Sequence, residues 1–396
     1  MADILQMNSK ERRRMVIMDQ VLTSNITLKR AAKLMQVSYR QAKRIKRSFL
    51  REKEAGLIHK NRGKESHNKK PKAFRETIID LYREDYPDFG PTFAAEKLLE
   101  RGYKVDHETL RRWLVTDGLW KRKRRRKQFR QRREPRHHFG ELIQVDGSHH
   151  HWFEDRGPSC CLMHMVDDAT GVSYFFFSEQ ETKKDAMALT WGWICKYGIP
   201  ESLYCDRKNV YLTDREPNLD EQLAGIDPKN DFEKACEKLG IEIITAYSPQ
   251  AKGRVERKHG VLQDRLVKEL RLAGISTIEE ANRFVQNGYM DSFNKKFARQ
   301  PASKEDHHVA LFSQNDLRKI FVFENQRRVS NDWIIQFNNR LFQIQKNCTV
   351  RPQPRDRVLI HEWLDGSLHF IFKGKELYVE EYGVEKNREE TAKAGT

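Results

Sequence analysis

The sequence lacks the features of a membrane or secreted protein. Its apolar runs fall short of the roughly 18 residues that a membrane-spanning helix requires. The first segment, 1–14, has no apolar core of the kind that a signal peptide carries. We therefore expect a protein of the cytosol without a membrane partner.

Cysteine is also scarce. Six cysteines occur among 396 residues, and no two of them form a Cys-x-x-Cys pair. This spacing argues against a zinc site. Four of the six lie inside apolar strand or helix patterns, which favours buried free thiols in a reducing compartment.

Acidic residues are outnumbered by basic ones. The chain has 74 Lys and Arg against 57 Asp and Glu, a formal net charge of +17. With 38% hydrophobic and 33% charged residues, its composition is polar but far from that of a disordered chain. The basic excess favours a polyanionic partner such as nucleic acid. The alternative is a ribosome-associated or simply basic protein.

The segment 27–47 has the pattern of two short helices joined by a turn. A short amphipathic helix comes first, Gln36-Val37 makes the turn, and Ser38 can cap the second helix. The second helix combines an apolar stripe with basic residues, as does a recognition helix that enters the major groove in a helix-turn-helix unit. The alternative is a basic helical hairpin that serves packing alone. The candidate DNA contacts on this helix are Arg40, Lys43, Arg44 and Arg47.

A second helical group is predicted over 73–120. One helix begins near Thr77, and Thr92 can cap another over 93–101 after a breaker cluster at 87–91. A third helix over 107–114 carries two basic candidates for DNA contact, Arg111 and Arg112. We expect a second helix-turn-helix unit, so that the two units together would span a longer DNA site.

Two polar linkers separate these parts. In 59–72, Arg62-Gly63-Lys64 resembles a hook for the minor groove, with a solvated linker as the equal alternative. The segment 121–133 contains ten Lys or Arg and no acid, so it would displace counterions when laid along DNA. The alternative is a solvated loop. Its candidate DNA contacts are Lys121, Arg122, Lys123, Arg124, Arg125 and Arg126.

From residue 139 the pattern changes to that of a mixed α/β layer. Three strands, a helix, a strand, a helix, a strand and a helix follow one another, an order that fits the ribonuclease H type of fold. A loop insertion is expected over 213–230. The predicted strands are 141–146, 159–167, 171–178, 201–205 and 240–245, and the predicted helices are 182–197, 231–239 and 252–272.

The C-terminal part has short strands. Trp333–Phe337 and Arg340–Ile344 flank Asn338-Asn339 as a hairpin, and more strands fit 356–363, 367–372 and 375–380. We expect a small all-β barrel of the SH3-like kind. The predicted domains are 1–58 and 73–120 (helix-turn-helix), 139–300 (catalytic core) and 330–385 (barrel), with linkers at 59–72 and 121–138, a connector at 301–329 and a tail at 386–396.

Three acids have positions that are hard to explain as surface decoration. Asp146 and Asp206 each close a predicted strand, and Glu256 lies where a turn opens into a helix. Together they could hold two divalent cations about 4 Å apart, an arrangement that activates an attacking oxygen and stabilises a leaving one in phosphodiester chemistry. Carboxylate oxygens suit Mg²⁺ (or Mn²⁺). Lys252, Arg254 and His259, near Glu256, are further candidate DNA contacts.

Other residues compete for the metal-binding role. Asp155, Asp167 and Asp168 lie in the same region, but Asp167-Asp168 sits at a hairpin turn, where aspartate is common. The run His149-His150-His151 could suggest a metal site. Adjacent residues on a strand or loop point in different directions, which favours a polar segment near the active site or DNA instead.

The sequence resembles bacterial insertion-sequence DDE transposases, whose catalytic core is shared with retroviral integrases. Three blocks carry the resemblance, namely 144–148 with Asp146, Cys205-Asp206, and 248–257 with Glu256. The flanking text, Asn61-Arg-Gly63, Asp88-Phe-Gly-Pro-Thr92, His138-Phe-Gly140 and Trp152-Phe-Glu-Asp-Arg-Gly157, is similar to transposases of the ISNCY type.

The resemblance covers about 10–380 and implies a metal-dependent DNA transposase. Asp146, Asp206 and Glu256 would take the three metal-binding positions, with two ions per site. The enzyme would bind the terminal inverted repeats of its element on double-stranded DNA, cut the ends and join them to target DNA. A homodimer or larger assembly on DNA is implied, in the bacterial cytoplasm near the nucleoid.

The chain departs from the family pattern in two places. The gap between the second and third acids is 49 residues, longer than in compact integrases, and Arg207-Lys-Asn follows Asp206 in place of Asn-Gly. No His/His/Cys/Cys zinc unit precedes the core. Two other functions stay open: a ribonuclease-H-like nuclease or resolvase that cuts without joining, and a DNA-binding regulator with an inactive core.

Overall fold

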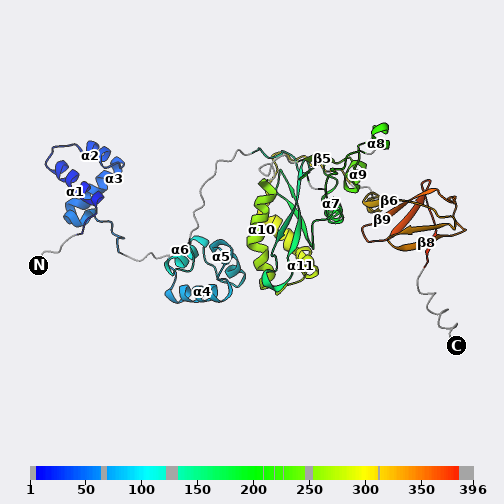
Figure 1. Ribbon diagram of the computed structural model, residues 1–396. Helices are drawn as coiled ribbons and strands as arrows, with labels where there is room; N and C mark the ends of the chain where they lie inside the picture. The colour runs from blue at the N-terminus through cyan, green and yellow to red at the C-terminus, as the bar shows by residue number, and fades with distance from the viewer. Residues whose placement is uncertain are drawn as a thin grey trace, which may run out of the picture. The chain divides into compact units, whose positions relative to one another are not determined.

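The structure is a computed structural model (Figure 1) with two compact units, residues 1–123 and 124–396. None of the helices in the described residues combines the length and apolar character needed to cross a membrane. Lys64, Arg122, Lys123, Arg124, Arg125, Arg126 and Lys252 lie outside the described residues. The described residues are 6–63, 69–121, 133–207, 209–217, 219–225, 227–245, 253–310 and 313–382.

The first helical group contains the helix pair predicted over 27–47. Thr27 caps α2 (Leu28–Leu34), and Ser38 caps α3 (Tyr39–Glu52) by accepting a hydrogen bond from the backbone N–H of Gln41 at 3.2 Å. Between them Gln36 takes a positive φ of 56°, which turns the chain. The apolar face of α3 packs against α1 (Ser9–Leu22) and α2, and a 3-10 turn (Lys53–Leu57) closes the group. The buried side chains include Ile17, Met18, Ala31, Met35, Ala42, Ile45 and Phe49.

The second helical group has three helices around its own apolar core. They are α4 (Lys72–Asp85), α5 (Pro91–Glu100) and α6 (His107–Thr116). The predicted cap at Thr92 is wrong. The N-cap is Gly90, since Pro91 occupies the first helical position, where its missing N–H costs nothing. Asp106 caps α6. The core contains Ile78, Tyr82, Phe89, Phe93, Leu98, Leu110 and Leu114.

The second unit is built on a five-stranded mixed sheet in the order β3-β2-β1-β4-β5. β1, β2 and β3 pair antiparallel, whereas β4 and β5 continue parallel to β1. Each predicted strand and helix has a counterpart, with the short helix α8 (Leu219–Ala224) in addition. The predicted end of the first strand at Asp146 is wrong, because pairing with β2 continues the strand to His150. The strands are β1 (Ile143–His150), β2 (Cys160–Asp167), β3 (Ser173–Ser178), β4 (Ser202–Cys205) and β5 (Glu242–Thr245).

Helices cover both faces of this sheet, as Figure 1 shows for α7 and α10. All eight residues of β2 are buried, because its alternate side chains enter two different cores. Met163 and Met165 pack with α7 (Lys183–Tyr197), while Cys160 and Leu162 pack on the side of α10. That second side is formed by α10 (Gly253–Leu272), α11 (Ile278–Phe284), a π-helical turn (Val285–Tyr289) and α12 (Met290–Phe297).

The segment 213–230 is more structured than the predicted loop. It contains a short helix, α8 (Leu219–Ala224). Asn230 then caps α9 (Asp231–Lys238) in a capping box with Glu233. Of the six free cysteines, the four at 160, 161, 205 and 236 are buried, which confirms the prediction of buried thiols for these four.

The C-terminal strands form two sheets around one core, and the described residues show no closed barrel. The sheet orders are β11-β10-β9-β6 and β12-β8-β7. β6 lies inside the segment predicted as a connector, where the helix α13 (Gln314–Ile320) precedes it. The strands are β6 (Val322–Arg328), β7 (Ile334–Phe337), β8 (Arg340–Ile344), β9 (Arg357–Trp363), β10 (Leu368–Phe372), β11 (Lys375–Glu376) and β12 (Val379–Glu381).

Candidate active site

Asp146 and Asp206 lie on neighbouring parallel strands. β1 and β4 pair with Ile143 opposite Leu203 and Gln144 opposite Tyr204. Two more residues along the same register place Asp146 level with Asp206, which directly follows the last residue of β4. The Asp146 side chain, on the central strand of the sheet, is 17% exposed.

The helix that carries Glu256 runs along β1 and is held to it at three levels. The backbone N–H of Val255 donates to Gln144 Oε1 at 3.2 Å, and Gln263 Nε2 donates to Ser148 Oγ at 3.1 Å. Between these levels, His259 Nδ1 lies 3.9 Å from Asp146 Oδ2.

These contacts follow from two periodicities. Residues 144, 146 and 148 share one face of β1, and residues 255, 259 and 263 share one face of α10. Glu256 is exposed in the first turn of α10, next to the residue tied to Gln144. The structure therefore brings Glu256 to the side of β1 that also presents Asp146.

The carboxylate oxygens of the three acids do not all lie within 4.8 Å of one another. In the described part of the chain, one group of His, Cys, Asp or Glu ligand atoms lies within 4.8 Å of one another, and it is formed by His138, Glu305 and His307. Asp146, Asp206 and Glu256 are outside that group. By their chemistry, carboxylate oxygens suit a hard cation such as Mg²⁺, which binds oxygen and retains water.

Asp168, at the turn between β2 and β3, has a larger role than the predicted turn chemistry. It is completely buried. Its Oδ1 accepts hydrogen bonds from Arg254 Nε at 2.6 Å, Arg133 at 2.6 Å and Gln144 Nε2 at 2.8 Å. Its Oδ2 accepts the backbone N–H of Arg136 at 2.8 Å. This carboxylate joins the approach to β1, the middle of the sheet and the first turn of α10.

Asp167, not Asp168, provides the side-chain hydrogen bonds that stabilise the turn between β2 and β3. Asp167 accepts hydrogen bonds from the N–H and the hydroxyl of Thr170 at 2.7 and 2.6 Å, so it closes the turn by itself. Burial raises the pKa of Asp167, although these hydrogen bonds oppose the rise. One aspartate side chain is enough to stabilise this turn. The presence of a second aspartate, Asp168, was therefore the feature of the sequence that indicated an additional role.

Two predicted DNA contacts on α10 face inward. His259 is 7% exposed and packs against the buried ring of His164, with ring centroids 5.1 Å apart. The Arg254 side chain is 16% exposed, and burial lowers its pKa while Asp168 opposes that effect. Both residues lie on the face of α10 that packs on the sheet, whereas the prediction treated them as surface contacts.

A basic pocket of about 240 Å³ opens beside the start of α10. Besides Arg254, it is lined by Arg257, Lys258 and Arg299, which the sequence interpretation did not select. Lys258 Nζ donates to the backbone carbonyl of Phe297 at 3.0 Å, and burial lowers its pKa to about 8. Arg257 and Lys258 were visible as basic neighbours of Glu256, but Arg299 reaches the pocket through tertiary packing.

The basic residues of α3 have the predicted orientation. The four predicted DNA contacts are exposed, on the side of the helix opposite its buried apolar stripe, whereas Lys46 is half-buried. Lys43 Nζ lies 4.8 Å from the centre of the Tyr39 ring. The four residues are Arg40, Lys43, Arg44 and Arg47.

The other predicted DNA contacts are more varied. Arg62 pairs with Glu11 at 2.7 Å, so its head is held within its own helical group. Arg111 pairs with Glu108 at 2.5 Å, and Arg112, 74% exposed, lies 3.5 Å from the same carboxylate. Lys121 is exposed.

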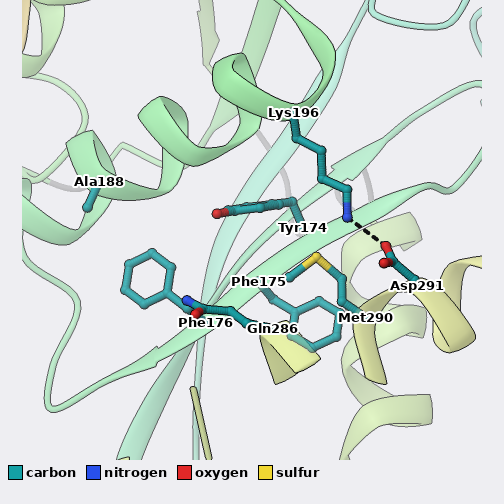
Figure 2. A pocket seen from close by; sticks show the side chains of 8 residues that line it. All are labelled: Tyr174, Phe175, Phe176, Ala188, Lys196, Gln286, Met290 and Asp291. Carbon is teal, nitrogen blue, oxygen red and sulfur yellow. Dashed lines mark hydrogen bonds and ion pairs between the residues drawn. The ribbon is translucent and has the colours of Figure 1, made fainter. Parts of the chain in front are cut away.

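A second pocket, of about 350 Å³, lies at the edge strand β3 and contains none of the three acids (Figure 2). Lys196 on α7 and Asp291 on α12 form an ion pair of 2.6 Å across it. β3 is two strands away from β1 in the sheet. This pocket is therefore separate from the candidate active site. It is lined by Tyr174, Phe175, Phe176, Ala188, Lys196, Gln286, Met290 and Asp291.

Curated relatives identify the family. No protein-family profile matches the chain. Over 380 residues it is 35% identical to a Sinorhizobium fredii protein named "Putative transposase y4bF", covering 94% of this chain and 81% of that protein. The chain belongs to this transposase family. It is also 26% identical over 412 residues to the transposase for insertion sequence IS1202 of Streptococcus pneumoniae, covering 94% of this chain and 86% of the relative.

Among solved structures, the chain is similar to retroviral integrases. The catalytic core domain of HTLV-2 integrase in complex with magnesium is 18% identical, with a TM-score of 0.30. The match covers 38% of this chain and 85% of the integrase chain. A simian T-cell lymphotropic virus intasome in complex with the PP2A regulatory subunit B56 gamma is 15% identical. That match covers 76% of this chain and 97% of the viral chain, with a TM-score of 0.35.

Proposed function

We propose that this member of the transposase family is a DDE transposase whose active site consists of Asp146, Asp206 and Glu256. The observation that carries the proposal is the β1–β4 register, which sets the first two acids level on neighbouring strands. The contacts between β1 and α10 supply the third acid from the same side. The mixed sheet with helices on both faces then serves as a ribonuclease-H-like core.

The three carboxylates would hold two Mg²⁺ (or Mn²⁺) ions. Bound there, the ions would supply an activated oxygen nucleophile and stabilise the oxygen that leaves phosphorus. Asp168 and Gln144 keep the first turn of α10 against β1, so that Glu256 starts from a fixed backbone position. Arg257, Lys258 and Arg299 in the basic pocket provide positive charge for the DNA backbone beside the acids.

Two reactions would use this site in turn. In the first, water attacks the phosphodiester at the end of the element, the bond to the 3′ oxygen breaks, and a 3′-hydroxyl is released. In the second, that hydroxyl attacks a phosphodiester of target DNA, forming a new phosphorus–oxygen bond as the target strand's own 3′ oxygen leaves. Both are in-line substitutions at phosphorus, so one arrangement of carboxylates serves both.

The N-terminal unit would recognise the terminal inverted repeats. The exposed basic side of α3 suits the major groove, with Arg111 and Arg112 on α6 as a second contact region. The basic segment from Lys121 to Arg126 and Lys252 would add phosphate contacts. Joining two ends requires at least two copies of the chain, so we infer a homodimer or larger assembly on DNA.

One assay separates this function from its alternatives. The full chain is incubated with Mg²⁺, a pre-cut element end and a plasmid target, and joined products are counted beside end binding. Joining that disappears in Asp146→Asn and Glu256→Gln, with binding retained, supports the proposal. The exposed Asp155→Asn is the matched control and should join normally. Cleavage without joining would favour a nuclease or resolvase, and binding without strand chemistry would favour a regulator.

A further inference from the structure

The basic pocket lies on the side of α10 that is turned away from Glu256. Arg254, Lys258 and Val261 are spaced by four and three residues, so they share the face of α10 that lines the pocket. Residues two apart on a helix do not share a face, and Glu256 is two residues from both Arg254 and Lys258. The pocket is therefore separated from the three acids by the helix itself.

Each of the three arginines that line the pocket is anchored through its Nε atom. Within the described part of the chain, their terminal Nη atoms have no hydrogen-bond partner. A guanidinium group fixed in this way still offers its terminal N–H donors to an anion, and its planar shape suits the oxygens of a phosphate. The Nε bonds are those of Arg254 to Asp168 Oδ1 at 2.6 Å, Arg257 to the carbonyl of Gly253 at 2.6 Å and Arg299 to the carbonyl of Ala169 at 3.1 Å.

Lys258 is held in the same pocket by contacts on several sides. Its Nζ donates to the carbonyl of Phe297 at 3.0 Å and lies 5.2 Å from the centre of the Phe293 ring. Gly171, in the turn between β2 and β3, packs against the side chain, since a Cβ at that position would lie 3.3 Å from Lys258 Cε. An ammonium group has three donors, and the Phe297 carbonyl uses one of them.

The pocket gathers cations without matching acids. None of the residues that line it is Asp or Glu. Asp168 neutralises Arg254, but it lies outside the lining. Like charges in one pocket repel one another, and a bound anion would remove that repulsion. Three lining cations form no ion pair with a carboxylate among the described residues, namely Arg257, Lys258 and Arg299.

The other walls of the pocket are apolar. Val166, Val261 and the ring of Phe297 line it beside the cations. Next to such walls the attraction between a cation and an anion is screened less than in open water. Arg257 and Arg299 are exposed, so the pocket is open to solvent and a phosphate within a longer chain can reach it.

We propose, on the basis of the function proposed above, that the basic pocket binds one phosphate of the DNA backbone other than the phosphate that reacts at the three acids. Arg257 and Arg299 hold its oxygens through their terminal nitrogens, and Lys258 adds a third positive charge. The bound phosphate fixes a DNA strand across α10 from Glu256. Element ends and target DNA both carry such phosphates, and two sets of measurements distinguish these sources.

The first set of measurements replaces the phosphates of a labelled element end one at a time by a neutral methylphosphonate. Binding to the full chain is followed by fluorescence anisotropy without Mg²⁺, so catalysis plays no part. For the wild type we expect one replacement to weaken binding about tenfold or more, because hydrogen bonds between charged groups are lost. The same replacement should cost nothing in the double variant Arg257→Gln with Arg299→Gln, which lacks the partners of that phosphate.

The second set uses a duplex of unrelated sequence as target DNA. The protein binds such a duplex in many registers, so the salt dependence of binding takes the place of the replacement series. Loss of one phosphate contact should make the slope of log K against log salt concentration shallower by about 1 in the double variant. Coupling to one phosphate of the element end assigns the contact to the end, whereas a shallower slope on the unrelated duplex alone assigns it to the target.

The matched control is Arg283→Gln, at an exposed arginine of α11, which should change neither measurement. Urea midpoints check that the double variant keeps its fold. If the pair of substitutions unfolds the core, Arg257→Gln alone provides the same test, because the Nε bond of Arg257 is made within α10.

Two negative results have different meanings. The same costly phosphate and the same salt slopes in the wild type and the double variant would overturn the phosphate site and leave the proposed transposase function standing. Failure of the wild-type chain to bind either DNA would contradict the proposed function together with the site.

Discussion

The buried carboxylate of Asp168 accepts a hydrogen bond from Arg254 Nε at 2.6 Å. The same oxygen accepts one from Gln144 Nε2, and Gln144 Oε1 accepts the N–H of Val255. These contacts close a ring from the β2–β3 turn through β1 to the first turn of α10. These hydrogen bonds fix the backbone at Val255, and thereby the backbone position of Glu256, which follows it in the chain.

Asp168→Asn should destabilise the protein and slow strand transfer. The substitution keeps the shape of the side chain but removes the charge that Arg254 and Arg133 face, leaving a buried cation without its counter-charge. We expect a loss of about 3 kcal/mol in the free energy of unfolding, measured by urea denaturation. Joining should fall at least about tenfold.

Two comparisons support the assignment of Asp168 as a positioning residue. End binding should stay unchanged, because the substitution lies outside the N-terminal unit. Asp155→Asn, at an exposed aspartate of the same unit, should alter neither stability nor joining. Wild-type stability and joining in Asp168→Asn would show that this contact does not hold α10 in place.

Removal of charge from α3 should weaken end binding in a salt-dependent way. Lys43→Ala with Arg47→Ala takes two exposed cations from the helix. If both contact phosphates, the slope of log K against log salt concentration should become shallower by about 2. The measurement is fluorescence anisotropy of a labelled element end over a range of salt.

The matched control is Lys375→Ala, an exposed cation on β11, which should leave the slope within error. An unchanged slope in the α3 double variant would show that this face does not lie on DNA. A loss of affinity that depends on the end sequence, with the slope retained, would instead indicate base contacts.

The C-terminal sheets should lose stability in mild acid through His361 on β9. Burial lowers the pKa of His361 below 6.5, against the opposing effect of Glu324, which lies 3.9 Å away. Nearby Lys238 and His369 lower it further. The folded state therefore favours neutral His361, so its stability is full above pH 6.5 and declines below it, where the unfolded chain takes up the proton.

His361→Gln should make the fall in stability smaller between about pH 7 and pH 5.5. Urea midpoints followed by tryptophan fluorescence measure the change. His107→Gln, on an exposed histidine, should retain the wild-type decline. An identical decline in His361→Gln would assign the acid sensitivity to other groups.

Local patterns were sufficient to predict much of this structure. The strand patterns predicted all five strands of the central sheet, and the prediction that Asp206 follows the end of a strand is confirmed. The predicted ending at Asp146 is wrong, because β1 continues to His150. The strand predicted at 159–167 is present as β2, but its burial on both faces emerged only in the structure.

Misplaced or missed features depend on long-range contacts or on weak local signals. β6 reads Val-Phe-Glu-Asn-Gln-Arg-Arg and has a polar second half, so pairing with β9 reveals it better than pattern does. Asp168 accepts hydrogen bonds from Arg133, Gln144 and Arg254, which are far from it in the sequence. His138 likewise stacks on the distant His307. Local sequence patterns do not predict such long-range contacts.

The most direct test of the proposed active site is the joining rate of Asp206→Asn beside that of Asp155→Asn. The register of β4 on β1 sets Asp206 level with Asp146, so its substitution tests that geometry. With a pre-cut end, saturating Mg²⁺ and equal end binding, we predict a loss of about a thousandfold or more for Asp206→Asn. The Asp155→Asn rate should equal that of wild type. Wild-type joining by Asp206→Asn would contradict the account.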